Sequence, residues 1–235
     1  MHILVTAGNT QTPIDQVRCI TNRFTGRTGA AIALAAQRRG HAVTLLTSHP
    51  EVLPDPYALG SGTGPPLEVR AYRTFAELRQ LMEEHLDQRQ AGRPYAAVVH
   101  CAAVGDYEVT GVFAGQSGLP QGPNLTAGKI SSRHDELWIR LKPTLKLVDQ
   151  IRAPWGFRGI LVKFKLEVGL DAEELWTRAE AAREQSGADL VCANTLEGMA
   201  DWALVGAGPQ GSRIARANLA DELLTRIETL AATRS

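Results

Sequence analysis

The sequence lacks an excess of either charge, because Lys+Arg and Asp+Glu both number 25 and the formal net charge is zero. Nucleic-acid-binding proteins usually carry a basic surplus, so we expect no nucleic-acid partner. The chain also lacks an apolar run of the roughly 20 residues that a membrane-spanning helix needs. The apolar start, residues 1–5, has no basic segment before it. These absences predict a cytoplasmic protein with no membrane partner.

Cysteine is scarce as well, and the three residues lie far apart at Cys19, Cys101 and Cys192. An odd, scattered set without a C-x-x-C pair argues against a disulfide framework and for a reducing compartment. The six histidines show no ligand spacing such as H-x-x-x-H, so we expect no metal held by protein side chains. A P-loop is also absent, because Lys129 is not followed by Ser or Thr.

Apolar strand patterns alternate with amphipathic helix patterns along the chain. This order predicts an α/β fold with a doubly wound, mostly parallel, Rossmann-like sheet. We expect a single domain of residues 1–235, with a small β-ribbon near the C-terminus at 202–216. The expected strands are residues 2–6, 42–47, 67–71, 95–100, 136–141, 159–164 and 189–193, and the expected helices are 27–39, 74–90, 144–152, 171–186 and 218–231.

Three segments have little periodicity. Residues 8–25 and 49–66 predict irregular connections. Residues 105–134 are rich in glycine and proline, and a loop of this length in a compact domain is usually functional. We therefore expect a long, mobile flap there. Ligands of doubly wound folds bind beyond the carboxyl ends of the strands, which directs attention to the residues that follow each strand.

The first strand is followed by a glycine, which invites a comparison with dinucleotide-binding proteins. Their G-x-G-x-x-G fingerprint is missing, because Gly8 stands alone. About twenty residues separate Gly8 from the expected helix, whereas a fingerprint loop is only a few residues long. The second strand ends at Thr47 and Ser48 without a carboxylate for a ribose. An NAD(P)-dependent oxidoreductase stays a less favoured alternative.

Residues 6–29 combine small hydroxyl residues and glycines with three arginines, Arg18, Arg23 and Arg27. The expected helix begins at the end of this stretch, and a helix N-terminus binds phosphate through its free N–H groups and its dipole. Arginine adds planar donors that suit phosphate. The residues alone therefore indicate a phosphate-binding segment.

The same stretch, TAGNTQTPIDQVRCITNRFTGRTG, resembles the N-terminal motif of phosphopantothenoylcysteine synthetases, which form the C-terminal domain of DNA/pantothenate metabolism flavoproteins. Asn9 replaces the second glycine of that motif, and Phe24 stands at a commonly serine position. Four later segments resemble the family in the right order: AAVGDY at 102–107, GKISS at 128–132, VKFKLE at 162–167 and DLVCAN at 189–194. Residues 198–202 depart from the stretch that contacts the base in many members.

The resemblance implies a stand-alone phosphopantothenate–cysteine ligase of coenzyme A biosynthesis. Such an enzyme activates a carboxylate with a nucleotide triphosphate and then transfers the acyl group to the amine of cysteine. It implies Mg²⁺ with CTP or ATP as substrate, no flavin, and assembly as a homodimer. The small-molecule partners would be phosphopantothenate, cysteine and the nucleotide. We expect no flavin-dependent decarboxylase domain before residue 1.

The resemblance also implies site residues. Lys129 would neutralise the triphosphate, Asn22 would hold the acyl intermediate, and Arg18 would contact the substrate or a second subunit. The expected nucleotide- and substrate-binding residues are Gly8, Thr10, Gly26, Ala102, Ala103, Asp106, Phe164, Lys165 and Asn194. Two questions stay open: CTP against ATP, and catalysis against a non-catalytic nucleotide-binding relative.

Overall fold

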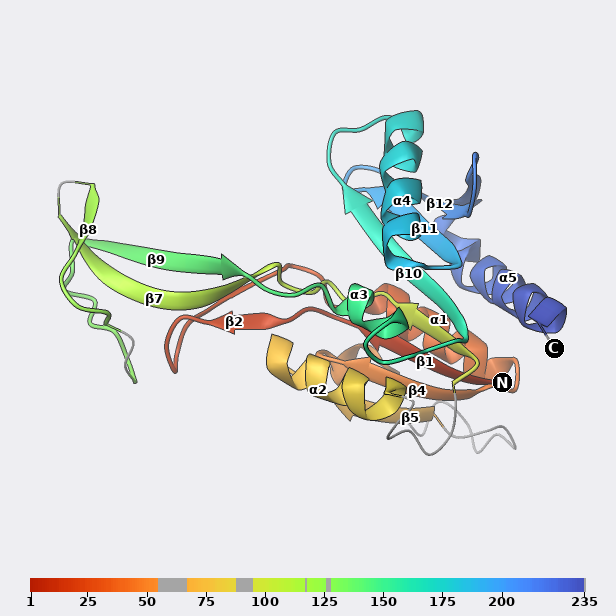
Figure 1. The fold of residues 1–235 in the computed structure, drawn as a ribbon, viewed down its shortest axis with the longest axis horizontal. Coiled ribbons are helices and arrows are strands. Elements are labelled where there is room, and N and C mark those ends of the chain that lie inside the picture. Colours follow the sequence, from red (N-terminus) through yellow and green to blue (C-terminus); the bar gives the residue numbers. More distant parts are fainter. Residues whose placement is uncertain (55–66, 88–94, 117, 126–127, 235) are drawn as a thin grey trace.

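The centre of the molecule is an eight-stranded sheet with the strand order β5-β4-β1-β6-β10-β11-β12-β13. The computed structural model describes residues 1–54, 67–87, 95–116, 118–125 and 128–234; Figure 1 traces the rest in grey. The strands are β1 (His2–Ala7), β4 (Ala42–Thr47), β5 (Leu67–Ala71), β6 (Ala97–His100), β10 (Ile160–Glu167), β11 (Leu190–Thr195), β12 (Trp202–Gly206) and β13 (Ser212–Ala215).

Strands β5 to β11 of this order pair in parallel, and β12 and β13 join antiparallel as the expected ribbon. From β1 the chain adds β4 and β5 on one side, and then β6, β10 and β11 on the other. The strand order therefore reverses between β1 and β6. Such a switch point leaves a crevice at the carboxyl ends of the two strands.

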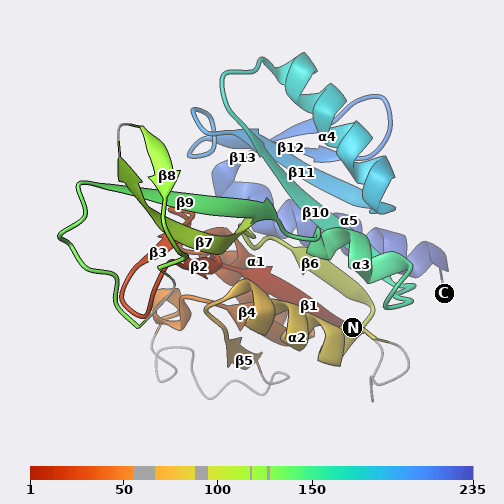
Figure 2. The same ribbon diagram turned by 60° about the vertical axis from the view of Figure 1, so that its left-hand side comes forward.

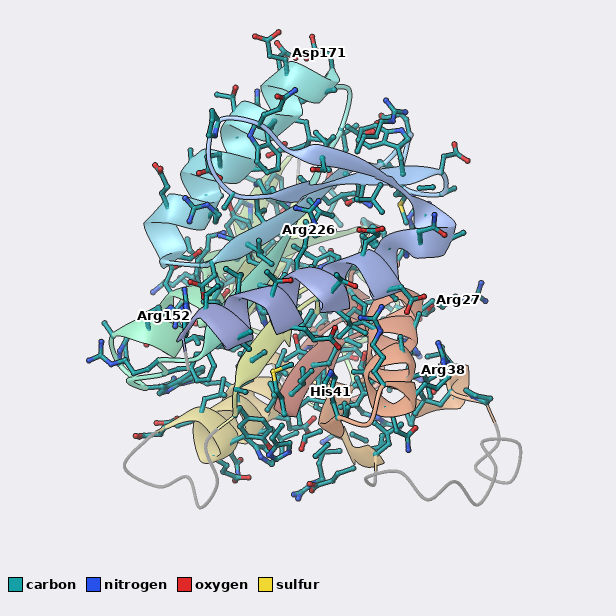
Figure 3. The ribbon with its side chains drawn as sticks, turned by 90° about the vertical axis from the view of Figure 1, so that its right-hand side faces the viewer. Arg27, Arg38, His41, Arg152, Asp171 and Arg226 are labelled. Atoms are coloured by element: carbon teal, nitrogen blue, oxygen red, sulfur yellow. The ribbon has the colours of Figure 1, made fainter. Side chains whose placement is uncertain are left out.

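Helices cover both faces of the sheet, because the strands are apolar on both sides. One face carries α1 (Arg27–Arg38) and α5 (Leu219–Arg234), which lie side by side in Figure 3. The other face carries α2 (Phe75–Leu86), α3 (Leu147–Arg152) and α4 (Ala172–Ser186). The expected α/β class with a mostly parallel sheet is confirmed.

Local signals in the sequence explain several helix boundaries. The Thr74 side chain accepts the Glu77 N–H in a capping box at the start of α2, and such boxes satisfy helix N–H groups. The Asp171 side chain caps α4 by accepting the Glu173 and Glu174 N–H groups, and Gly187 ends this helix with a φ of 62°. Helix α2 stops at Leu86, earlier than the expected 74–90, and residues 88–90 lie outside the described part.

Two small antiparallel sheets involve the segments that were expected to be irregular, and the second also includes the strand that was expected at 136–141. Strands β2 (Gln11–Pro13) and β3 (Cys19–Thr21) form a hairpin within residues 8–25. Strands β7 (Tyr107–Gln116), β8 (Leu119–Gln121) and β9 (Glu136–Pro143) form a three-stranded sheet, which we call the arm. Figures 1 and 2 show the arm leaving the body beside the β2–β3 hairpin.

The glycines of β7 made residues 105–134 resemble a loop, yet they have a role in the arm. A Cβ atom on Gly111 would lie 2.8 Å from the Phe113 ring, and one on Gly115 would lie 2.6 Å from the Trp138 ring nitrogen. Glycine thus leaves room for an aromatic ring on the sheet surface. The 105–134 segment is therefore largely strand up to Gln121, and residues 117 and 126–127 are outside the described part.

The connection 49–66 contains a short 3₁₀ turn, Pro50–Val52, and its residues 55–66 are not described. Within the described ranges, no helix combines the length and the apolar character that crossing a bilayer requires.

Candidate active site

A crevice of about 1090 Å³ opens at the carboxyl edge of the central strands. It lies at the switch point between β1 and β6 and extends along the ends of β10 and β11. Most of its walls come from residues 22–28, 100–106, 144–149 and 163–166. They are completed by Gly8, Ala182, Gln185, Asn194, Leu196, Met199, Ala200 and Arg216. Nine of the residues expected in the site line it: Gly8, Asn22, Gly26, Ala102, Ala103, Asp106, Phe164, Lys165 and Asn194.

The start of α1 forms one wall of this crevice. Gly26 is the N-cap residue with a φ of 80°, no side chain caps the helix, and its first turn contains no acidic residue. The approach to β1 is tight, because a Cβ atom on Gly26 would lie 2.3 Å from the Gly8 nitrogen. The uncapped N–H groups and the helix dipole therefore face the crevice as a site for an anion.

Asn22 joins the first motif to the segment after β6. Its side-chain Nδ2 donates to the Ala103 carbonyl at 3.0 Å, and Ala103 N–H donates to the Gly8 carbonyl at 2.8 Å. Asn9, which replaces the second glycine of the motif, takes part in the same network of hydrogen bonds. Its Nδ2 donates to the Asn22 carbonyl at 2.6 Å, and its backbone N–H donates to the Ser48 hydroxyl at 2.8 Å. Asn9 thus fixes the backbone that presents Asn22.

Thr10 and Asp106 lie where the body meets the arm. Thr10 lines a smaller pocket with Asn22 and Asp106, and its hydroxyl accepts the Gly105 N–H at 2.8 Å. A Cβ atom on Gly105 would lie 3.3 Å from that hydroxyl, so the glycine permits a close contact. Lys146 Nζ donates to Asp106 Oδ1 at 2.8 Å, and this bond raises the pKa of Lys146.

The residues at the ends of β10 and β11 divide between the two faces of the sheet. Phe164 packs against the α1/α5 side, and Asn194 shares this side by strand alternation. Lys163 and Lys165 point to the opposite side, where Lys165 Nζ pairs with Glu167 at 2.9 Å. The crevice therefore has an α1 lobe, with Gly26, Thr28, Phe164, Asn194 and Arg216, and an α3/α4 lobe, with His100, Asp149, Lys163, Ala182 and Gln185.

Lys129 and Arg18 do not line this crevice. The exposed Lys129 lies between Gly128 and Ile130, and both neighbours bond to the tip of the β2–β3 hairpin. Gln16 N–H donates to the Gly128 carbonyl at 3.0 Å, and Ile130 N–H donates to Asp15 Oδ2 at 3.1 Å. Arg18 donates to the Ile130 carbonyl at 2.9 Å.

The Asp15 carboxylate is at the centre of these contacts between the hairpin tip and residues 128–130. It accepts the backbone N–H groups of Val17 and Arg18, both at 2.8 Å, and pairs with the Arg18 guanidinium. The Arg18 hydrogen bond, followed by the Val17 N–H, holds the Asp15 pKa far below its usual range. Arg18 is therefore occupied with holding the backbone around Lys129.

Sequence reasoning overlooked Thr6, His100, Lys163 and Arg216. Arg216 donates to the Thr28 hydroxyl at the start of α1 and lines the α1 lobe. Thr6 and His100 lie at the carboxyl ends of β1 and β6, and Lys163 is in register with His100 in the middle of β10. The strand-end positions of Thr6 and His100 were an available signal, since parallel strands direct such residues to one edge; the place of Lys163 depends on the register of β10 against β6.

The strand order agrees with that of dinucleotide-binding folds, yet the end of β4 does not suit a ribose. Ser48 follows the strand, and its hydroxyl is engaged by Asn9. In the described ranges, no three His, Cys, Asp or Glu side chains gather as a set that could hold a metal ion.

The fold and the crevice define a Rossmann-like α/β protein with a ligand site at the switch point. The family model described as DNA/pantothenate metabolism flavoprotein C-terminal domain matches residues 1–203. The chain therefore belongs to this family, and the resemblance found in the sequence is confirmed.

Relatives with curated names agree. The coenzyme A biosynthesis bifunctional protein CoaBC of Thermococcus kodakarensis is 36% identical over 197 residues, which cover 83% of this chain and 41% of that protein. CoaBC of Escherichia coli K12 is 31% identical over 196 residues, with coverages of 83% and 41%. The chain thus spans about two fifths of the length of these relatives.

Solved structures show the same architecture. The crystal structure of the DNA/pantothenate metabolism flavoprotein from Streptococcus pneumoniae is 27% identical, with a TM-score of 0.80 and coverages of 98% of this chain and 99% of that one. A Cab2 H337A mutant in complex with phosphopantothenate-cysteine is 19% identical, with a TM-score of 0.71 over 100% of this chain and 89% of that one. This second likeness is one of fold.

Proposed function

We propose that this protein is a phosphopantothenate–cysteine ligase, which joins 4′-phosphopantothenate to L-cysteine through an acyl-nucleotide intermediate. The observation that carries the proposal is the hydrogen bond from Asn22 to the Ala103 carbonyl. It joins the two most distinctive motifs at one crevice, beside the uncapped N-terminus of α1. The names of the curated relatives support the same pathway.

The proposed reaction has two steps. A carboxylate oxygen of phosphopantothenate attacks the α-phosphorus of the nucleotide, and the bond from that phosphorus to pyrophosphate breaks. The amine of cysteine then attacks the acyl carbon, loses a proton and displaces the nucleoside monophosphate. Both steps depend on positioning and on charge stabilisation more than on covalent chemistry by the protein.

The residues of the crevice divide these tasks. The start of α1 at Gly26, together with Gly8, offers backbone donors to phosphate. Phe164 and Asn194 lie in the α1 lobe, where they would contact the nucleotide. Asn22, Ala102, Ala103 and Asp106 would hold the acyl intermediate, with Thr10 supporting this wall. Lys165 faces the opposite lobe and would reach phosphate only after releasing Glu167.

Magnesium would enter with the nucleotide as part of the substrate, bound by phosphate oxygens and water. This fits the described residues, which offer the crevice Asp106 and Asp149 but no gathered set of three metal-binding side chains. We propose CTP as the preferred nucleotide, on the bacterial-style motif at residues 6–29. A clear advantage of ATP in kcat/KM would contradict this preference.

We further propose that the protein acts as a cytoplasmic homodimer. Leu137, Ile139 and Leu141 form an apolar stripe on one face of β9, and they are 38%, 37% and 41% exposed. Exposed apolar surface of this kind suits a protein interface. Since Lys129 lies outside the crevice of its own chain, the arm would bring it to the crevice of the partner subunit.

The test is pyrophosphate release by the purified protein with nucleotide, Mg²⁺, phosphopantothenate and cysteine, together with mass spectrometry of the product. We expect pyrophosphate release that depends on phosphopantothenate, and amide product that depends on cysteine. A non-catalytic relative would bind nucleotide without turnover, and an oxidoreductase would instead quench or shift NADPH fluorescence.

A further inference from the structure

A row of three polar side chains crosses the centre of the sheet at the floor of the α3/α4 lobe. Thr6 of β1 lies opposite His100 of β6, and His100 lies opposite Lys163 of β10. The residues two positions earlier in the three strands all pack against α2 and α3: Leu4, Val98 and Leu161. By strand alternation the polar row faces the same side.

The hydrogen bonds of Thr6 fix which nitrogen of His100 carries a proton. The Thr6 hydroxyl is fully buried and accepts the Ala102 N–H at 3.2 Å. Its own proton needs an acceptor, and His100 Nδ1 lies 3.0 Å away. Nδ1 therefore accepts, and the neutral ring carries its proton on Nε2. Burial and the charge of Lys163 lower the pKa of His100 to about 4, which keeps the ring neutral near pH 7.

The Nε2–H group is an unused donor at the wall of the crevice. His100 is 8% exposed and lines the crevice. No hydrogen bond joins its Nε2 to another side chain or backbone group in the described ranges. The ring is largely buried while this donor opens onto the crevice, so it can donate to a ligand atom with a lone pair.

Lys163 adds a positive charge beside this donor. Its Nζ donates to the Ala182 carbonyl of α4 at 2.7 Å, which leaves two protons for a ligand. No carboxylate of the described chain lies within 4.0 Å of it, whereas Lys146 and Lys165 pair with Asp106 and Glu167. A half-buried ammonium with no carboxylate within ion-pair distance can bind an anionic oxygen.

Asp149 of α3 lines the same lobe and decides which anion fits. A phosphate dianion would be repelled by its carboxylate, whereas a zwitterion with an ammonium group would be attracted. An α-amino acid presents both charges on adjacent groups. The α1 lobe, with a free helix N-terminus and Arg216, is the better place for phosphate.

We propose that the α3/α4 lobe is the subsite for the amino-acid substrate, with His100 Nε2–H and Lys163 binding its carboxylate and Asp149 facing its ammonium group. The proposal rests on the proposed ligase function and deepens it. Thr6 is a positioning residue, because its hydroxyl directs Nε2–H toward the lobe.

The first experiment measures KM for cysteine, nucleotide and phosphopantothenate in Lys163→Met, His100→Phe and His100→Gln. Hydrogen bonds to a charged group are worth enough that Lys163→Met should raise KM for cysteine about ten- to hundredfold. His100→Phe should act in the same direction, and His100→Gln, which keeps an amide donor near Nε2, should recover most of the loss. Lys142→Met, an exposed change on the arm, is the matched control and should leave the three values unchanged.

The second experiment replaces cysteine with cysteamine, which has the same thiol and amine but no carboxylate. The wild-type protein should prefer cysteine in kcat/KM, and Lys163→Met should lose most of this preference. Cysteine-independent pyrophosphate release should be equal in the wild type and Lys163→Met, which shows that the variant folds and performs the first step.

Other outcomes overturn the inference and leave the ligase function standing. A raised KM for nucleotide or phosphopantothenate would assign the lobe to a phosphate, and an unchanged cysteine preference would remove the amino-acid subsite. The proposed function itself fails in a different way, through a wild-type protein that makes no amide from any of these substrates.

Discussion

At the scale of single residues, Asn22 and Lys129 differ in place as well as in chemistry. Asn22 is neutral and bonded to the wall of the crevice at Ala103. Lys129 is exposed, and its backbone neighbours are fastened to the hairpin tip. A flexible ammonium suits a leaving pyrophosphate, whereas a fixed amide suits an acyl group.

Lys129→Ala should therefore lose pyrophosphate release even without cysteine, by about 10²–10³ in rate, as for removal of one charged transition-state contact. Asn22→Asp keeps the size of the side chain and should impair amide formation more than pyrophosphate release. Pyrophosphate release without cysteine, with mass-spectrometric detection of the acyl-nucleotide, separates the two effects. Equal loss of release in both variants would contradict the division of roles.

The lowered pKa of His100 makes the free energy of unfolding depend on pH. The pKa of His100 in the folded protein is lowered from 6.5 to about 4, so the unfolded chain takes up a proton first as the pH falls. Stability is thus lost between pH 6.5 and 4, by about 3 kcal/mol for the shift of this one group. Urea unfolding across this range should show a loss that is larger in the wild type than in His100→Gln by about this amount, since the other groups titrate in both proteins. Parallel curves would mean that the folded protein accepts the proton on His100.

At the scale of elements, the stripe on β9 is the feature with the clearest consequence. Leu137, Ile139 and Leu141 share one face of a strand that is exposed along its whole length. Ile139→Lys places a charge at the centre of this stripe and should shift the proposed dimer to monomer. Sedimentation velocity checks the change, with Lys142→Glu on the other face as control. A monomeric wild type would refute the proposed assembly.

The sequence predicted the elements of the body well, because their patterns are local. The strand 42–47 was predicted to the residue, since an apolar run between Gly40 and a polar loop leaves little choice. In the arm, the predicted strand 136–141 is confirmed as β9. Strand β7 was not predicted, because its glycines interrupt the alternation and its pairing partner β9 lies in a distant part of the sequence. Pairing between distant strands overrides local propensity.

The same contrast holds for the site. Motif residues such as Gly26 and Ala103 reached the crevice, because strand ends of a parallel sheet converge. The bond between Asn9 and the Asn22 backbone, and the row of Thr6, His100 and Lys163, depend on side-chain contacts across strands. No spacing along one chain encodes those contacts. The roles of the predicted site residues stay predictions.

At the scale of the whole molecule, the proposed dimer shares its sites between subunits. If Lys129 serves the crevice of the partner subunit, a Lys129→Ala chain and an Asn22→Asp chain can form a mixed dimer with one intact site. Unfolding and refolding an equal mixture should then restore about a quarter of the wild-type activity, from random pairing of the two chains. Each variant alone, treated in the same way, is the control. No recovery in the mixture would mean that Lys129 acts at the crevice of its own chain.

The position of β1 also bears on how the chain reaches its fold. Ile3 pairs with Val43 on one side and with Ala97 on the other. On the ribosome, β1 can meet β4 early, but its second edge stays open until β6 has emerged. An apolar strand with an open edge is a template for pairing with other chains, and a contact so distant in sequence forms slowly. The crevice also needs residues 163–166 and Arg216, so it is complete only after most of the chain has emerged. A product truncated before β6 would expose an aggregation-prone strand edge and would lack the site.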